Sequence, residues 1–322
     1  MINSTKPCKP VKQLTQVGVL FVWLLTLTSQ IAYAQQPEIF VHMAAMDSKD
    51  QRNQYEIELL QLALSLTQDQ HPTPFKLQPT HQADQSGQTH VNLKRTEVLA
   101  IKGFYGHNFF IKFSARNDLL KQLHAVEFPL ERGIVGYRVS FVANNNNLKP
   151  PNDLVQLSRH RTVQGIGWLD TQILKHNGIN VFTVSKYDNM FAMIASQRAE
   201  YFFRGANEWL HEYRNFKPKY PKLVLEQNIA LHYPMPRFYF TAKDNIANAQ
   251  RVMRGLKLAY ESGKFQQLWF NYYGESIKRT RLSQRHIIEL DNPFIHEIDP
   301  QYQQYNFDIA ELRDLEANSV SE

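Results

Sequence analysis

The sequence predicts an α/β fold, because segments typical of strands alternate with segments typical of helices along most of its 322 residues. Hydrophobic residues make up 43% of the chain, which is enough for a packed interior. At Gly167 and Gly205 a strand-like run leads directly into a helix-like run. Such connections are typical of parallel pairing, so we expect parallel strands.

The first half of the chain begins with a strand at 38–43 and continues with a helix. Asp47 or Ser48 can cap this helix. Its apolar residues recur with helical spacing, at Tyr55, Leu59, Leu62 and Leu66. The other predicted elements of this half are a strand at 75–78, a polar loop at 79–90, a helix at 91–101, a strand at 108–113 and a short helix at 116–123.

The second half repeats the alternation up to a polar end. We expect strands at 136–142, 162–165, 181–184, 201–203 and 238–240. We expect helices at 168–176, 187–196, 205–214, 246–262 and 265–273. Residues 296–322 are polar and acidic, with too few apolar residues to form a core of their own.

The first 34 residues have the pattern of a signal peptide. Lysines at 6, 9 and 12 precede an apolar run at 17–27, and Ala32-Tyr33-Ala34 offers a small-x-small cleavage site. The apolar run is shorter than the ~20 residues that span a membrane, although an uncleaved anchor is the alternative. Removal of 34 from 322 residues leaves 288, which favours two lobes. We therefore expect a soluble periplasmic protein, cleaved after Ala34.

Charge and cysteine content exclude several classes of protein. The net charge is +6, but three of these charges belong to leader lysines, which leaves about +3 and no case for nucleic acid. The one cysteine, Cys8, precedes the apolar run, so it cannot carry a lipid anchor at the cleavage site. The mature chain has no thiol for a disulfide, a metal site or a nucleophile.

Catalytic and metal motifs are absent from the sequence. The histidines show no His-x-x-x-His or His-Glu-x-x-His spacing, and no Gly-x-Ser-x-Gly motif occurs. Gly165-x-Gly167 is too short for a dinucleotide loop. Export would also separate the chain from cytosolic ATP and NAD. We expect no catalytic group, no cofactor and no metal.

Five segments carry a resemblance to a known family: 127–138, 165–170, 201–205, 231–236 and 285–288. In these segments the sequence resembles the type II periplasmic solute-binding proteins, near the amino-acid-binding family 3 group. The resemblance implies two α/β lobes joined by two crossover strands, with a central cleft. Lobe 1 would take residues 35–136 and 237–295, lobe 2 residues 137–236, and residues 296–322 would form the tail.

Three positions at strand ends and helix starts are candidates for the cleft, where backbone N–H groups favour negative charge. Arg204 directly follows an apolar strand and could hold a carboxylate or phosphate by two hydrogen bonds, with an ion pair to Glu208 as the alternative. Ser114 and Arg116 follow the strand that ends at 113, where a solvated helix start is the alternative for Arg116.

Aromatic and acidic residues are further candidates for the expected cleft. Trp168 could stack on a solute or pack between the lobes, and Asp170 could contact a solute or simply favour the helix dipole. Tyr137 and Tyr233 lie on the two expected crossovers, where they would pack at the hinge or bind solute.

The resemblance also shows two departures. Amino-acid-binding relatives usually carry a Thr-x-x-Arg-like clamp in lobe 1, whereas here Ser114 and Arg116 have a different spacing. Trp168 stands where a small hydroxyl residue is expected. Both departures argue against a free amino acid as the solute.

The leading hypothesis is therefore a monomeric periplasmic binding protein that closes around a small polar or anionic solute. It would serve an ABC-type transporter or a sensor in the inner membrane. One alternative is a dehydratase-like enzyme on the same scaffold, with Glu208 or Asp170 as acid or base and a raised pKa. The other is an interaction module without ligand, whose cleft is filled by its own side chains, Trp168 among them.

Overall fold

The computed structural model describes residue 1 and residues 35–44, 53–80, 93–144 and 148–317. The chain divides into two compact units, Met1–Pro37 and Glu38–Glu322, and all helices and strands of the described residues lie in the second unit. The predicted signal peptide, apart from its first residue, and the predicted cap at Asp47 or Ser48 lie outside the described residues.

Two sheets and five helices form what we call the first block. β1 (Glu38–His42) pairs in parallel with β2 (Phe75–Pro79). β11 (Arg237–Thr241) lies between β3 (Ile111–Ser114) and β4 (His124–Val126) and is antiparallel to both. The helices of this block are α2 (Gln54–Leu66), α3 (Leu93–Ile101), α4 (Asn117–Gln122), α9 (Ile246–Glu261) and α10 (Lys264–Thr280).

The second block contains a five-stranded sheet and a parallel pair. The sheet has the order β12-β10-β5-β8, and β9 pairs with β5. Its strands are β5 (Tyr137–Ala143), β8 (Phe202–Gly205), β9 (Leu223–Leu225), β10 (Ile229–His232) and β12 (His286–Glu289). The parallel pair is β6 (Thr162–Gly165) with β7 (Val181–Val184). The helices are α5 (Leu154–Leu157), α6 (Leu169–His176), α7 (Tyr187–Ala195) and α8 (Trp209–Phe216).

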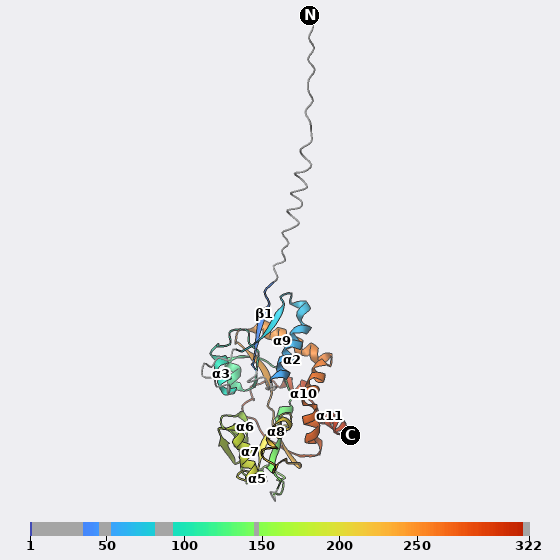
Figure 1. Ribbon diagram of the computed structural model, residues 1–322. Coiled ribbons are helices and arrows are strands. Elements are labelled where there is room, and N and C mark those ends of the chain that lie inside the picture. Colours follow the sequence, from blue (N-terminus) through green and yellow to red (C-terminus); the bar gives the residue numbers. More distant parts are fainter. Residues whose placement is uncertain (2–34, 45–52, 81–92, 145–147, 318–322) are drawn as a thin grey trace. The chain divides into compact units, whose positions relative to one another are not determined.

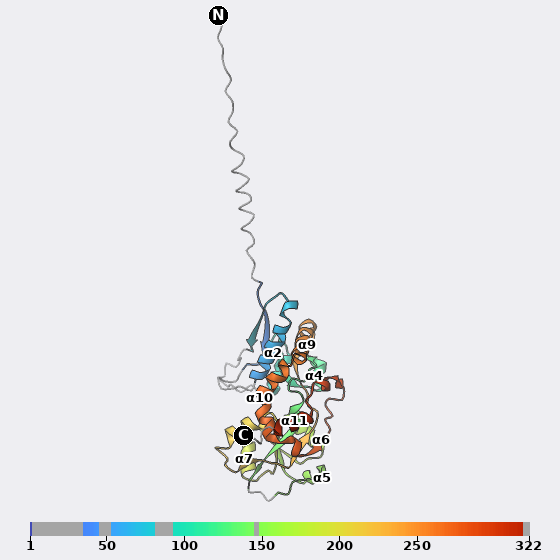
Figure 2. The same cartoon turned by 90° about the vertical axis from the view of Figure 1, so that its right-hand side faces the viewer.

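Within the unit Glu38–Glu322, Figures 1 and 2 show α5, α6 and α7 grouped at one end and α2 and α9 at the other. The chain passes between the blocks through residues 127–136, which include the short helix η2 (Ile134–Gly136), and returns through residues 233–236. We call these two segments the first and second crossover.

Close helix packing organises the first block. Buried residues of α2, among them Leu60 and Ala63, face α9, whose Val252 and Leu256 are fully buried. Gly255 is required at this contact, because a Cβ there would collide with the backbone carbonyl of Ala63.

The observed topology differs from the expected one in two respects. The strands are not all parallel, because β5 and β11 are antiparallel to each of their partners. Residues 237–295 were assigned to lobe 1, yet β12 pairs with β10 of the second block. A third passage of the chain therefore leads from α10 through η3 (Leu282–Gln284) to β12. The other lobe boundaries remain a proposal.

The polar tail predicted at 296–322 is folded over most of its length. It contains η4 (Pro300–Tyr305) and α11 (Ile309–Ala317), and Tyr302, Phe307 and Leu312 are buried. These few apolar residues form no core of their own; they join existing clusters of buried residues in the two blocks.

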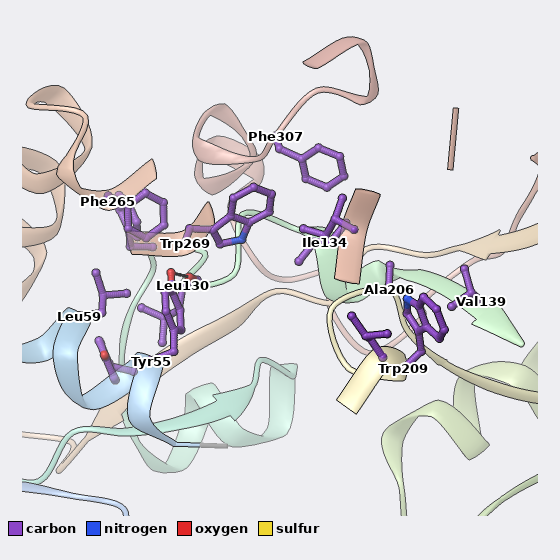
Figure 3. Packing of buried hydrophobic residues seen from close by; sticks show 14 of the residues in the cluster. Tyr55, Leu59, Leu130, Ile134, Val139, Ala206, Trp209, Phe265, Trp269 and Phe307 are labelled. Carbon is purple, nitrogen blue, oxygen red and sulfur yellow. Dashed lines mark hydrogen bonds between the residues drawn. The ribbon is translucent and has the colours of Figure 1, made fainter. Parts of the chain in front are cut away.

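The largest cluster of buried apolar residues extends through both blocks. Figure 3 shows Tyr55 and Leu59 of α2 at one side and Val139 and Trp209 of the second block at the other, with Trp269 of α10 among them. Trp209 Nε1 donates a hydrogen bond of 3.1 Å to the carbonyl of Ser276 in α10. The blocks are thus held together by a continuous apolar interior as well as by the crossovers.

Candidate functional site

Four cationic side chains lie within or at the start of otherwise apolar strands: Lys112 in β3, Arg138 in β5, Arg204 in β8 and Arg237 in β11. Each of them meets at least one carboxylate. Burying a charge is costly unless it is paired, so these contacts explain how the strands tolerate cations.

Arg138 and Tyr233 both bind Asp170, which lies in the first turn of α6. Nη2 of Arg138 is 2.6 Å from Oδ1 of Asp170, and the hydroxyl of Tyr233 donates to the same oxygen at 2.5 Å. Burial raises the pKa of Tyr233 well above its usual value. The positive charge of Arg138 opposes this shift, whereas the negative charge of Asp170 adds to it. The phenol therefore stays protonated and acts as a donor.

Arg204 is held by two carboxylates of α8 and its cap. Its Nε and Nη2 donate to the carboxylate of Glu212 at 2.6–2.9 Å, and Nη2 lies 2.9 Å from Oε2 of Glu208. The guanidinium also lies over the ring of Trp168, 4.9 Å from its centroid. Arg204 thus makes the ion pair with Glu208 that was the alternative to solute binding. The hydroxyl of Tyr187 also donates a hydrogen bond to the carboxylate of Glu212.

Glu208 has arginines on three sides. Besides Arg204, Nη2 of Arg237 lies 3.0 Å from its Oε1 and Nη1 of Arg138 lies 3.8 Å from its Oε2. Burial by itself would raise the pKa of Glu208, but the three guanidinium groups outweigh it and hold the pKa far below its usual range. A carboxylate that stays ionised cannot donate a proton near neutral pH, so Glu208 lacks the raised pKa that the dehydratase alternative requires.

A second branch of contacts begins at Arg237 and runs into the first block. Nη1 of Arg237 lies 3.3 Å from Oε1 of Glu131, and Nζ of Lys112 lies 2.7 Å from the same oxygen. Lys112 also contacts Glu56 of α2. Burial lowers the pKa of Lys112, and the nearby carboxylate of Glu131 offsets part of this shift. Burial by itself would raise the pKa of Glu131, but the charges of Arg237 and Lys112 outweigh it and lower that pKa.

These contacts form one connected set that joins β3 and α2 of the first block to β8 and α8 of the second. We call it the charge network; its members are Glu56, Lys112, Glu131, Arg138, Asp170, Arg204, Glu208, Glu212 and Arg237. It lies where the sequence predicted solute contacts at the ends of strands and the starts of helices.

Trp168 packs against its own block. A Cβ at Gly165 would collide with the indole, so glycine is required for this fit. The indole also stacks on Phe202 at 6.5 Å between ring centroids and lies 6.2 Å from Tyr187. Trp168 therefore covers one side of the Arg204 guanidinium. A contact between Trp168 and a solute stays a prediction.

Arg116 lies outside the charge network. Its guanidinium makes paired hydrogen bonds to Glu97 at 2.8 and 2.9 Å and to Asp118 at 2.7 and 3.1 Å. These bonds, those to Glu97 foremost, raise the pKa of Arg116 above its usual value. Ser114, two residues earlier, is the register partner of Arg237 and so lies beside the network.

Tyr137 also lies apart from the network. Its ring stacks on His232 at 4.2 Å between centroids and contacts Phe307 at 5.4 Å. These are packing contacts at the crossovers, the first of the two roles considered for this residue. Of the eight candidates, the structure brings together Arg204, Trp168, Asp170, Glu208 and Tyr233, with Ser114 adjacent, and separates Arg116 and Tyr137. Their roles in binding stay predictions.

Sequence reasoning missed several members of the network: Glu56, Lys112, Glu131, Arg138, Glu212 and Arg237. One signal could have found the three cations among them. Lys112 stands in Phe-Phe-Ile-Lys-Phe, Arg138 in Gly-Tyr-Arg-Val-Ser-Phe and Arg237 in Pro-Arg-Phe-Tyr-Phe, so each interrupts a strand-like apolar run as Arg204 does. A lone cation in a buried strand needs a buried anion nearby.

A membrane-spanning helix and a metal-binding cluster are both absent from the described residues. None of their helices is both long and apolar enough to cross a membrane. No group of three or more His, Cys, Asp or Glu side chains in that part of the chain could hold a metal ion.

Comparison with known proteins rests on structure alone. No protein-family model matches the sequence, and no curated protein matches it. An ancestral arginine-binding protein bound to arginine superposes with a TM-score of 0.51 at 13% identity, over 74% of this chain and 100% of the other. A histidine kinase sensor domain with similarity to periplasmic binding proteins also gives 0.51, at 11% identity over 75% and 97%.

A periplasmic binding protein of Salmonella typhimurium with high arginine specificity gives 0.51 as well, at 12% identity over 74% of this chain and 99% of the other. These similarities show the fold: the chain has the α/β fold of the periplasmic binding proteins. At such low identity they do not extend to the solute.

Proposed function

We propose that this chain, which has the fold of the periplasmic binding proteins, is itself a periplasmic solute-binding protein. The observation that carries the proposal is the charge network, which joins the two blocks and retains buried polar atoms without partners. Among the described residues of the network, Oε2 of Glu56, Oε2 of Glu131 and Nε of Arg138 are buried and make no hydrogen bond, and the same holds for Oδ1 of Asn207 beside the network. Buried polar atoms of native proteins are nearly always paired, so these atoms support a bound molecule.

The solute that fits best is small and polar, with both donors and acceptors. The unpaired atoms comprise three acceptors and one donor. A simple anion fits less well, because the guanidinium of Arg204 is already held by Glu212 and Glu208, which an anion would have to displace. We therefore keep the small polar solute of the sequence-based hypothesis and place the anionic one second.

Delivery to a membrane partner is part of the same proposal. Similar folds occur in a periplasmic binding protein and in a histidine kinase sensor domain, so an ABC-type transporter and a membrane sensor both remain partners to test. In either case the solute would bridge the two blocks and increase the population of the closed form.

A ligand panel tests the proposal. The protein, expressed from the full chain and purified after export, is melted in the presence of small polar metabolites. A true solute at ~100 times its Kd should stabilise the protein by about 2.7 kcal/mol and reduce its radius of gyration. Glu208→Gln should abolish the shift, whereas Asp118→Asn, at an exposed ion pair outside the network, should retain it.

One other function is favoured by a specific observation. Trp168 packs on Gly165, and most charged groups of the network have partners within the chain, as an interaction module without ligand would require. If no metabolite changes the melting temperature or the radius of gyration, the solute-binding proposal is wrong and this alternative replaces it.

A further inference from the structure

The segment after β12 follows a path that touches both blocks and both crossovers. We call residues 289–312 the belt. Five of its apolar side chains are at most 7% exposed: Leu290, Ile298, Tyr302, Phe307 and Leu312. Burial of this kind orders a segment that its polar composition would otherwise leave in solvent.

The belt begins at the second block. Asp291 exchanges two hydrogen bonds with Asn177 at the end of α6, of 2.8 and 3.0 Å, and its carboxylate lies 3.1 Å from Nε2 of His176. The next residue, Asn292, is 3% exposed and donates a hydrogen bond of 2.7 Å to the carbonyl of Pro234. The belt is thus fixed to α6 and to the second crossover within two residues.

The belt then reaches the first block. The carbonyl of Phe294 accepts a hydrogen bond of 2.8 Å from the backbone N–H of Asn117, the first residue of α4. Farther along, the ring of Tyr302 lies 5.4 Å from that of Phe238 in β11, and Tyr305 lies 4.5 Å from Phe128. These contacts attach the belt to the sheet of the first block.

The belt finally covers the first crossover. The backbone N–H of Phe307 donates to the carbonyl of Arg132 at 3.0 Å, and the guanidinium of Arg132 lies 3.1 Å from both oxygens of Glu311. Gly133 faces Asn306 so closely that a Cβ would lie 2.8 Å from its Cγ. The ring of Phe307 contacts Trp269 of α10 at 5.9 Å, as Figure 3 shows.

The first crossover contains a tight turn with unusual backbone dihedral angles. Arg132 and Gly133 are consecutive and both have positive φ, 53° and 76°. A few residues at element ends usually absorb the dihedral change of domain closure. Here the belt contacts both residues directly, through Phe307, Glu311 and Asn306.

We propose that the belt restrains the hinge, so that the two blocks rotate against each other less than two crossovers alone would allow. A rotation that moved α6 away from α4 would have to break the contacts of Asp291 or Phe294. A rotation about Arg132 and Gly133 would have to break those of Phe307 and Glu311. This proposal concerns motion only and does not depend on any solute.

Distance measurement between two spin labels tests the proposal. Gln172 of α6 and Lys257 of α9 are exposed on opposite blocks and can be replaced by cysteine for labelling. Cys8 is the only native cysteine, so Cys8→Ser removes any background. In the otherwise unchanged protein the distance distribution should be narrow, and Phe307→Leu should broaden it about twofold.

A matched control separates hinge release from general loosening. Phe191→Leu removes a buried ring of α7 that packs on Phe141, Phe202 and Phe216 of the second block, far from the belt in sequence and contacts. It should destabilise the protein but leave the distribution narrow. Equal broadening in this control would overturn the proposal.

A second variant covers the case in which Phe307→Leu does not fold. Asn177→Ala combined with Glu311→Gln removes the side chain that makes both hydrogen bonds to the backbone of Asp291 and, at the other end of the belt, the ion pair with Arg132. Broadening in this double variant supports the restraint. A distribution as narrow as that of the unchanged protein overturns it.

Discussion

Nη2 of Arg237 lies 3.0 Å from Oε1 of Glu208, and this pair connects the strand that returns to the first block with the residue that caps α8 in the second. The same carboxylate holds Arg204 through its other oxygen. One glutamate thus satisfies cations from two sheets. Its loss would leave arginines of both blocks with fewer partners in a largely buried environment.

Replacing Glu208 by glutamine should therefore destabilise the fold. Breaking a fully buried ion pair costs about 3–5 kcal/mol, and we expect about 2–3 kcal/mol here because the Glu208 side chain keeps some solvent contact. Urea denaturation followed by circular dichroism measures this loss. Asp118→Asn, whose side chain is 72% exposed in its pair with Arg116, should change stability by less than about 1 kcal/mol. Equal losses in the two variants would contradict the importance of the network.

The stability of the protein should fall at acidic pH in a way that depends on Glu208. The folded-state pKa of Glu208 lies below its usual value of 4.5, so the folded state favours the ionised form. Its contribution is complete above the unfolded-state pKa and is lost as the pH falls from about 5 towards the folded-state value. Denaturation between pH 6 and about 3 should show a steeper loss for the unchanged protein than for Glu208→Gln. Parallel curves would show that other carboxylates dominate.

Gly165→Ala should destabilise the second block. The added methyl group would collide with the indole of Trp168, and overpacking of this kind costs about 1–3 kcal/mol. A double-mutant cycle with Trp168→Ala provides the check. Since the smaller residue removes the collision, the two effects should not add, and the coupling should be at least about 0.5 kcal/mol. Additive losses would mean that the glycine is needed for another reason.

Export should produce a new N-terminus at Gln35. The predicted cleavage site, Ala32-Tyr33-Ala34, follows an apolar run of the length that a signal peptide requires. Intact-mass measurement of protein from the periplasmic fraction should match residues 35–322. Ala34→Arg should block processing, while Gln36→Asn, beyond the site, should not. A precursor that remains uncleaved in membranes would favour the anchor instead.

Local patterns predicted most of the secondary structure. The strands at 162–165 and 181–184 were predicted with the observed bounds, and α6, α7 and α9 lie within one residue of their predictions. These segments have a clear apolar period or a glycine boundary. The short strands β4, β9, β10 and β12 were not predicted, because three or four residues carry too little periodicity.

The candidate site was predicted only in part. Arg204 and Glu208 are neighbours on the strand and helix that the sequence indicated, so their pairing was one of the alternatives considered. Arg138 and Arg237 were missed, because their carboxylate partners, Asp170 and Glu208, are about 30 residues away in sequence. Only the folded chain shows which carboxylate each buried cation meets.

The sequence by itself determined the α/β class and the resemblance to the periplasmic binding proteins, because these rest on the local order of strands and helices. The tertiary structure alone decided that β12 joins the second block and that residues 289–312 pack across the crossovers. It also decided that Arg204 faces carboxylates of its own chain. The physical reason is the same in each case: pairing, burial and charge compensation depend on residues that are distant in sequence, which no local pattern records.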